Sequence, residues 1–226
     1  MSTSILKIYG LQRTKTNYLQ KFLELNYSNI IVLSNFSGWK HGFVKEAIDW
    51  SGSDWEETQD ISKKYYYHNL KECMQKEKII NNAFVNKQTK YFFTFRDPYN
   101  TYLSRKKHYP DKLAFMKNFI HDWNSKNSHY LGFIQENHER VYKIRFEDFI
   151  DSKKNSIFLE IANHFDLQKK NNLFIDHKKR LDPRMRETNT RFVEPSSTRV
   201  SEFESAYFRD HLDMKVMNEL NYEIQE

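Results

Sequence analysis

The sequence predicts a single α/β domain spanning residues 1–226, and three observations favour this class. The length of 226 residues suits one domain with a substantial core. Short apolar runs of strand length alternate along the chain with stretches whose apolar residues recur at helical spacing. The 18 Phe and 14 Tyr residues argue against disorder, although 29% of all residues are charged.

Residues 5–25 hold the first predicted strand, a turn and a helix. A short apolar, β-branched run, typical of a buried strand, is formed by Ile5, Leu6, Ile8 and Tyr9. Gly10 follows where a tight turn needs a permissive backbone. Leu and Phe side chains then recur at helical spacing over residues 19–25. The loop between them carries two cations and three short hydrogen-bonding side chains: Arg13, Thr14, Lys15, Thr16 and Asn17. Because a helix N-terminus favours an anion, this loop predicts a phosphate or sulfate cradle; the alternative is an ordinary turn with solvated cations and a threonine cap.

A second strand is predicted at residues 29–35, and a Trp-Lys-His triplet follows it. Gly38 and Gly42 bracket this triplet, which contains Lys40 and His41. In open parallel sheets ligands sit beyond the carboxyl ends of the strands, so this pair is a candidate cation and base. The alternative is a loop whose histidine is only solvated or hydrogen-bonded.

The third predicted strand, residues 91–95, ends at Arg96. Asp97 is a good helix cap, and the proline after it suits the first position of a helix predicted over residues 99–107. Ser104 lies eight residues after Arg96. The plainer interpretation is a capped helix with a structural arginine.

The remaining strands and helices are predicted from the spacing of apolar residues along the chain. A fourth strand is predicted at residues 140–146, and we interpret the Glu147 and Asp148 that follow it as caps or ion-pair partners. Further helices are predicted at residues 65–80, 113–131, 157–165 and 200–220. Residues 168–197 are polar and predict a long mobile loop.

Two of these segments resemble the donor-binding motifs of the sulfotransferases. The family's phosphosulfate loop reads roughly [PQ]-[KR]-[ST]-G-T-[TN]-[WY], and residues 12–18 follow it except that Lys15 replaces the glycine. That replacement fits if the φ angle of Lys15 is helical. The strand that ends in Arg96, with Ser104 beyond it, is similar to the family's R-[DN]-P-x5-S motif for a 3′-phosphate. Residues 145–149 are similar to its R-[YF]-E-D-[LF] segment.

The resemblance implies a P-loop-like, nucleotide-kinase-like fold with a central parallel sheet of about four or five strands flanked by helices. It implies 3′-phosphoadenosine-5′-phosphosulfate (PAPS) as donor, an acceptor hydroxyl or amine, and in-line sulfuryl transfer without a metal. The sequence leaves open whether the acceptor is a small molecule, a glycan or a peptide tyrosine. The implied donor contacts are Arg13, Thr14, Lys15, Thr16, Asn17, Tyr18, Arg96, Ser104 and Arg199.

The implied general base is His41, with Lys40 beside it and Arg13 near the bridging oxygen of the donor. His68 and His108 are the alternatives for the base.

The sequence also bears on other functions, on the location of the protein and on metal binding. A small-molecule kinase or nucleotide hydrolase on the same fold is the alternative, but the loop lacks G-x-x-x-x-G-K-[ST]. The net charge of +6 suggests nucleic-acid binding as a third hypothesis. Because the cations are scattered among acidic residues, however, no nucleic-acid partner is expected. The single Cys73 suits a reducing compartment, and no run of about 18 apolar residues exists, so we expect a cytoplasmic chain without a membrane span. The nine His residues lack ligand spacing, so no metal site is expected.

Overall fold

The protein was analysed as a computed structural model. It describes residues 3–33, 39–46, 76–106, 109, 111–150, 154–175 and 200–224. Several predictions fall on other residues and therefore lie outside the described part of the chain: His68, His108, Arg199 and most of the helix at residues 65–80.

A parallel sheet forms the centre of the molecule. Its four strands in the described part of the chain stand in the order β2-β1-β3-β4, and every pairing is parallel. The strands are β1 (Ser4–Gly10), β2 (Ile30–Leu33), β3 (Lys90–Phe95) and β4 (Val141–Arg145). The predicted sheet of about four or five parallel strands is confirmed.

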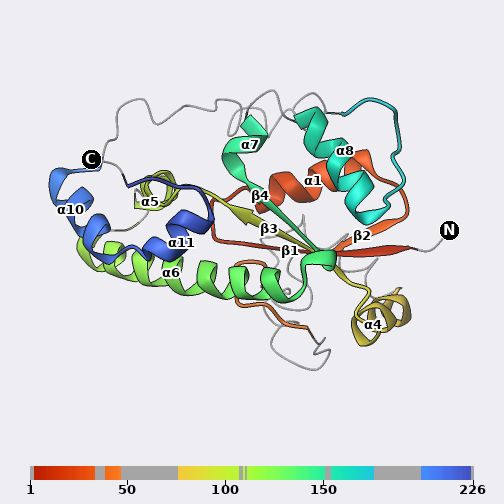
Figure 1. Ribbon diagram of the computed structural model, residues 1–226, viewed down its shortest axis with the longest axis horizontal. Coiled ribbons are helices and arrows are strands. Elements are labelled where there is room, and N and C mark those ends of the chain that lie inside the picture. The colour runs from red at the N-terminus through yellow and green to blue at the C-terminus, as the bar shows by residue number, and fades with distance from the viewer. Residues whose placement is uncertain are drawn as a thin grey trace.

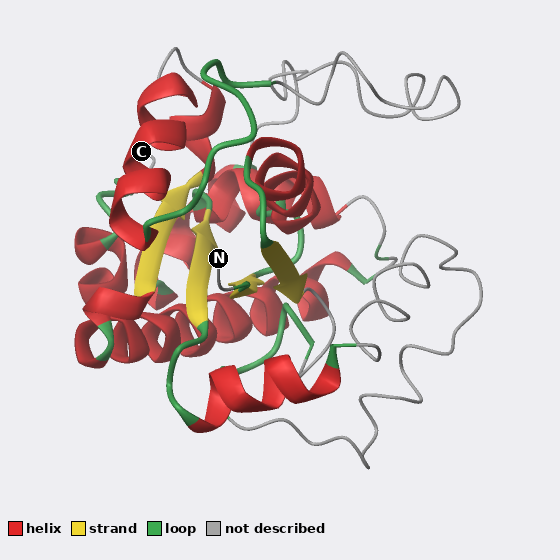
Figure 2. Cartoon of the chain, turned by 90° about the vertical axis from the view of Figure 1, so that its right-hand side faces the viewer, coloured by secondary structure: helices red, strands yellow, loops and turns green. Residues whose placement is uncertain are grey.

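Helices cover both faces of this sheet, so the molecule has three layers (Figures 1 and 2). One face carries α1 (Thr16–Asn26), α7 (Phe146–Ile150) and α8 (Lys154–Phe165). The other carries α4 (Glu77–Val85) and α6 (Lys112–Glu136), with the short 3-10 helix η2 (His138–Arg140) leading into β4. The helices α5 (Pro98–Lys106), α10 (Glu202–His211) and α11 (Met214–Glu219) gather at the end toward which β3 points.

Alternation along the strands divides the core into two main clusters. Tyr9 and Phe93 face α6, and their rings lie 5.7 Å apart between centroids. Their neighbours Ile8 and Phe92 point to the opposite face and pack with Phe22 of α1 and its surroundings. Because successive side chains of a strand point to opposite faces, both faces of these central strands are apolar and buried.

The ends of several elements differ from the predicted ones because local hydrogen bonds set them. The closing helix predicted over residues 200–220 is two helices, since the Asp213 carboxylate accepts from the backbone N–H of Lys215 at 2.9 Å and starts α11. The helix predicted at residues 113–131 continues to Glu136 as part of α6.

The start of the predicted mobile loop is fixed in place. Residues 168–175 run beside the end of α1, where Lys169 forms an isolated antiparallel bridge with Tyr27. The side-chain amide of Asn26 donates to the carbonyl of Ile175 at 3.1 Å and accepts from its N–H at 2.8 Å. The prediction of a mobile loop is wrong for this part; the remainder of the loop lies outside the described residues.

Candidate active site

The turn after β1 is packed directly against β3. A Cβ atom on Gly10 would lie 2.1 Å from the Thr94 hydroxyl oxygen and 2.7 Å from that of Thr14. The φ angle of Gly10 is 159°, a backbone conformation that residues with a side chain rarely adopt. Glycine is therefore required here by close approach, as the sequence predicted for a tight turn.

The loop beyond Gly10 turns through two left-handed residues. Arg13 has φ 73°, and Lys15, at the N-cap of α1, has φ 65° and ψ 30°. The condition under which a lysine would fit this position without strain, a helical φ, is not met, because the backbone of Lys15 is left-handed. Together these residues bring two cations to the N-terminus of α1, where the helix dipole favours an anion.

Two threonines of the loop turn inward. The hydroxyl of Thr14 donates to the carbonyl of Leu11 at 2.7 Å and lies 2.8 Å from that of Thr94. Thr16 is buried as well. The Thr14 hydroxyl thus helps to fix the shape of the loop, whereas Arg13 is exposed.

The two residues after Thr16 have different surroundings. Asn17 is exposed, and its side-chain oxygen accepts a hydrogen bond from the Lys40 ammonium group. The Tyr18 ring packs edge-on against Phe149 of α7, with 5.4 Å between the ring centroids. Asn17 thus lies beside Lys40 in the candidate site, whereas the Tyr18 ring packs against α7.

Arg96 lies at the carboxyl end of β3 and joins the same loop. Its Nη1 donates to the carbonyl of Arg13 at 3.1 Å, and its guanidinium carbon stands 4.9 Å from the centroid of the Phe146 ring. The Lys15 ammonium lies 5.7 Å from the centroid of the same ring, so both cations lie close to Phe146. The Arg96 Nε is buried with no hydrogen-bond partner among the described residues. Burial lowers the pKa of Arg96, although Glu147 and Asp97 oppose this.

Asp97 and Glu147 build the turn that carries Arg96. The Asp97 carboxylate caps α5 by accepting from the Asn100 N–H at 2.8 Å, as predicted. Glu147 accepts from the Asp97 N–H at 3.1 Å and from the Tyr222 hydroxyl at 3.0 Å. Ser104 lies half-buried on α5. Glu147 is thus a structural acceptor, in line with its interpretation as a cap.

Lys40 and His41 are brought against the loop by backbone pairing with Gly10. The Gly10 N–H donates to the Lys40 carbonyl at 2.9 Å, and His41 Nδ1 lies 2.6 Å from the Gly10 carbonyl oxygen. Since a carbonyl only accepts, Nδ1 carries the proton, and the lone pair of a neutral ring is on Nε2. The Trp39 ring holds the imidazole edge-on, 5.1 Å between centroids.

Burial lowers the pKa of both basic groups, but only that of His41 falls below neutral pH. It lowers the pKa of His41 to about 4, helped by the positive charges of Lys40, Lys126 and Arg105. It lowers the pKa of Lys40 to about 8. At neutral pH the His41 ring is therefore neutral, with Nε2 able to accept a proton.

Most residues predicted for the site converge around the Gly10 turn. Direct contacts join Arg13 with Arg96, Asn17 with Lys40, and Gly10 with His41. Sequence reasoning missed Phe146, which both Lys15 and Arg96 contact, although it stands in the R-F-E-D segment that was already singled out.

Comparison of the whole structure with solved structures decides the fold. The crystal structure of a sulfotransferase from Alicyclobacillus acidocaldarius aligns with 99% of this chain and 98% of its own, with a TM-score of 0.51 and 12% identity. The chain has a sulfotransferase-like fold. The crystal structure of mouse sulfotransferase SULT7A1 complexed with PAP aligns with 87% of this chain and 68% of its own, with a TM-score of 0.42 and 16% identity. No family model and no curated protein matches the sequence.

Two further properties concern the described residues of this sulfotransferase-like fold. No described helix is long and apolar enough to cross a membrane. The same residues hold no group of three or more His, Cys, Asp or Glu side chains placed to bind a metal ion.

Proposed function

We propose that the protein transfers a sulfuryl group from PAPS to a hydroxyl or amine of a small-molecule or glycan acceptor. The observation that carries this proposal is the meeting of a cationic helix N-terminus, Arg96 and a neutral His41 at the carboxyl ends of the two central strands. The sulfotransferase-like fold supports it. When bound, PAPS supplies the sulfuryl group, and the protein supplies position and charge.

The donor-binding residues fit two separate anionic groups. We assign Arg13, Lys15 and the first N–H groups of α1 to the 5′-phosphosulfate, with Thr14 and Thr16 shaping that loop from inside. We assign Arg96 and Ser104 to the 3′-phosphate. The buried Arg96 Nε supports this, because an arginine fork with an unmatched N–H suits a phosphate oxygen. Arg199 stays a prediction.

His41 is the proposed general base. Its Nδ1–H is held by the Gly10 carbonyl, which leaves Nε2 to take the acceptor's proton as the new S–O or S–N bond forms. The bond between the sulfur and the bridging oxygen of PAPS breaks in the same step, and adenosine 3′,5′-bisphosphate leaves with that oxygen. Lys40, bound to Asn17 of the donor loop, stands where its charge would steady the transferring group.

The kinase alternative needs a Mg²⁺ site, and the acids best placed for one are already engaged. Glu147 accepts from Asp97 and Tyr222, and Asp148 pairs with Arg145 at 3.2 Å. These contacts favour the sulfotransferase over a small-molecule kinase.

Ligand binding and transfer assays test the proposal. Adenosine 3′,5′-bisphosphate should raise the melting temperature of the protein more than AMP or ATP–Mg²⁺ does. Arg96→Ala should remove that preference for the bisphosphate, since a charged contact contributes about 1.5–3 kcal/mol. A larger shift with ATP–Mg²⁺ would support the kinase instead.

The base is tested separately. His41→Ala should lower turnover with labelled PAPS by roughly 10²–10⁴-fold while binding the bisphosphate normally. Wild-type turnover in a folded His41→Ala variant would move the role to another residue.

A further inference from the structure

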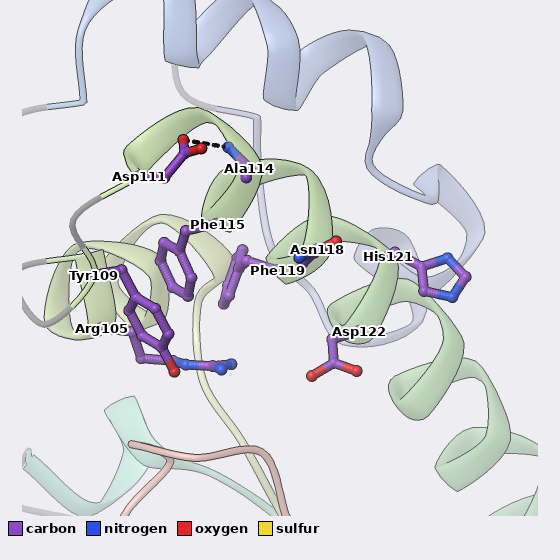
Figure 3. Close-up of a pocket in the computed structure, with 9 residues that line it drawn as sticks. All are labelled: Arg105, Tyr109, Asp111, Ala114, Phe115, Asn118, Phe119, His121 and Asp122. Atoms are coloured by element: carbon purple, nitrogen blue, oxygen red, sulfur yellow. Dashed lines mark hydrogen bonds between the residues drawn. The ribbon is translucent and has the colours of Figure 1, made fainter.

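A cavity of about 560 Å³ opens between the end of α5 and the first half of α6 (Figure 3). Its lining combines aromatic rings with charged and amide groups: Arg105, Tyr109, Asp111, Ala114, Phe115, Asn118, Phe119, His121 and Asp122. Nothing in the proposed donor site uses these residues. The volume suits a small organic molecule or a sugar unit.

A short series of contacts links the cavity to the proposed base. Asp122 of the cavity pairs with Lys126 at 3.1 Å. The Lys126 ammonium stands 5.9 Å from the centroid of the Trp39 ring, which in turn packs against His41. The positive charge of Arg105, on the cavity wall, is also among the causes that lower the pKa of His41.

The guanidinium group of Arg105 packs against aromatic rings of α6. Its guanidinium carbon lies 5.4 Å from the centroid of Phe115 and 5.6 Å from that of Phe119, and Tyr109 stacks on Phe115 at 4.1 Å. Figure 3 shows the guanidinium extending beneath these rings toward the side of the cavity where Asp122 lies. The Arg105 Nε is buried with no hydrogen-bond partner among the described residues. A buried donor without a partner is unfavourable until a ligand supplies an acceptor.

The acids of the cavity are already engaged. The Asp111 carboxylate caps α6 by accepting from the Ala114 N–H at 2.9 Å, and Asp122 pairs with Lys126. The charge of Asp122 is thus paired with that of Lys126, and the Asp111 carboxylate lies at the N-terminus of α6, where the helix dipole favours a negative charge. The described contacts of Arg105 are instead with the rings of Phe115 and Phe119. The wall thus offers one cation with a planar fork, which matches a carboxylate or sulfate.

We propose that this cavity binds the acceptor and that Arg105 selects acceptors carrying a carboxylate or sulfate group. The rings of Tyr109, Phe115 and Phe119 cover the apolar body of the acceptor, and its free hydroxyl points toward His41. This inference rests on the proposed function and adds to it the class of acceptor.

Calorimetric binding of matched acidic and neutral probes tests the selection without any turnover. One pair is 4-hydroxyphenylacetate and its amide; the other is a glucuronate-containing disaccharide and its carboxyl-reduced form. The wild-type protein should bind the acid of at least one pair about tenfold to a hundredfold more tightly than its neutral partner, as a charged contact predicts. The pair that shows the preference tells a phenolic acid from an acidic glycan.

Variants separate Arg105 from general charge. Arg105→Gln should abolish the preference for the acid, and Arg105→Lys should keep part of it. Arg209→Gln, an exposed position on α10, removes the same charge elsewhere and should leave the preference unchanged. Equal binding of acid and neutral probe by the wild type, no binding of either acid, or an undiminished preference in folded Arg105→Gln would each overturn the proposal.

The donor site provides the independent readout. Folded Arg105→Gln should still be stabilised by adenosine 3′,5′-bisphosphate to the wild-type extent. If the wild type does not bind the bisphosphate, the sulfotransferase proposal fails, while the calorimetric result still decides whether Arg105 selects acids. If the bisphosphate binds but the acids do not, only the acceptor inference fails.

Discussion

Lys15 adopts a backbone conformation that is unfavourable for its residue type. Its φ of 65° and ψ of 30° are left-handed, and this conformation costs a side-chain-bearing residue about 1–2 kcal/mol. In return the ammonium group is placed at the N-terminus of α1 and 5.7 Å from the centroid of Phe146. A local strain of this kind persists where surrounding contacts fix the loop, as Thr14 does here.

Replacing Lys15 by Gly and by Ala measures this strain. Both variants lose the ammonium group, so the difference between them isolates the backbone. Lys15→Gly should be more stable than Lys15→Ala by about 1 kcal/mol in urea unfolding, because glycine populates left-handed φ without a steric penalty. A glycine variant that is less stable than the alanine variant would contradict the left-handed conformation.

His41 should titrate far below an ordinary histidine. Burial and the charge of Lys40 lower its pKa to about 4, so its NMR resonances should show a midpoint near pH 4; a His41→Gln spectrum would identify them. Between the usual pKa of 6.5 and about 4, the unfolded chain binds a proton that the folded protein does not. Stability from the neutral His41 is therefore complete above about pH 6.5 and is lost as the pH falls toward 4. A midpoint near 6.5 would show an open, solvated ring.

At the scale of elements, periodicity found the strands and helices, and local hydrogen bonds set their ends. The predicted strand at residues 140–146 stops at Arg145 because Phe146 begins α7. The predicted helix at residues 200–220 divides at Asp213 because that side chain can cap a new helix. Both signals are present in the sequence, but capping competes with a continuing apolar pattern, and periodicity alone does not decide between them.

The site was predictable only as far as its motifs are local. The order of strand, Arg96 and capping Asp97 is local, and the structure keeps it. The hydrogen bond between His41 and Gly10 joins residues that are far apart in the sequence. The sequence therefore indicated His41 only by its position after a predicted strand, and it did not indicate the partner. No sequence motif indicates the proposed role of Arg105, because that role depends on which rings of α6 stand opposite α5.

Two glycines offer a matched test of where a side chain is tolerated. A Cβ on Gly10 would lie 2.1 Å from the Thr94 hydroxyl oxygen and 2.7 Å from its carbonyl oxygen, and the latter belongs to the backbone of β3. Nothing lies within 4 Å of a Cβ on Gly132, which is inside α6. Gly10→Ala should therefore destabilise the protein by about 2 kcal/mol or more through overpacking and an unfavourable φ.

Gly132→Ala should instead stabilise the protein by about 0.5–1 kcal/mol, because alanine is the better helix former. Thermal and urea unfolding of the two variants check both signs. Equal effects of the two substitutions would mean that the β1–α1 turn is not packed against β3.

At the scale of the whole molecule, the C-terminal helices hold the turn that carries Arg96. Glu147 accepts hydrogen bonds from Tyr222, beyond α11, and from Asp97, at the start of α5. The end of the chain thus fixes one wall of the proposed donor site from a distance in sequence, which links the stability of the C-terminal helices to the geometry of the site.

Glu204 of α10 is the other link, and its titration tests it. Its carboxylate accepts from the Tyr102 hydroxyl at 2.6 Å and pairs with Lys106, both on α5. Although burial opposes it, the hydrogen bonds from Lys106 and Tyr102 lower the pKa of Glu204 from 4.5 to about 2. A lowered carboxylate pKa stabilises the folded state fully above about pH 4.5, and this stabilisation disappears as the pH falls toward 2.

Glu204→Gln should therefore be about 2 kcal/mol less stable than wild type at pH 7, with a difference that shrinks between pH 4.5 and 2 in urea unfolding. Glu202→Gln, an exposed position on the same helix, should change stability by less than about 0.5 kcal/mol; a Glu204→Gln difference independent of pH would show that the carboxylate charge does not join α10 to α5.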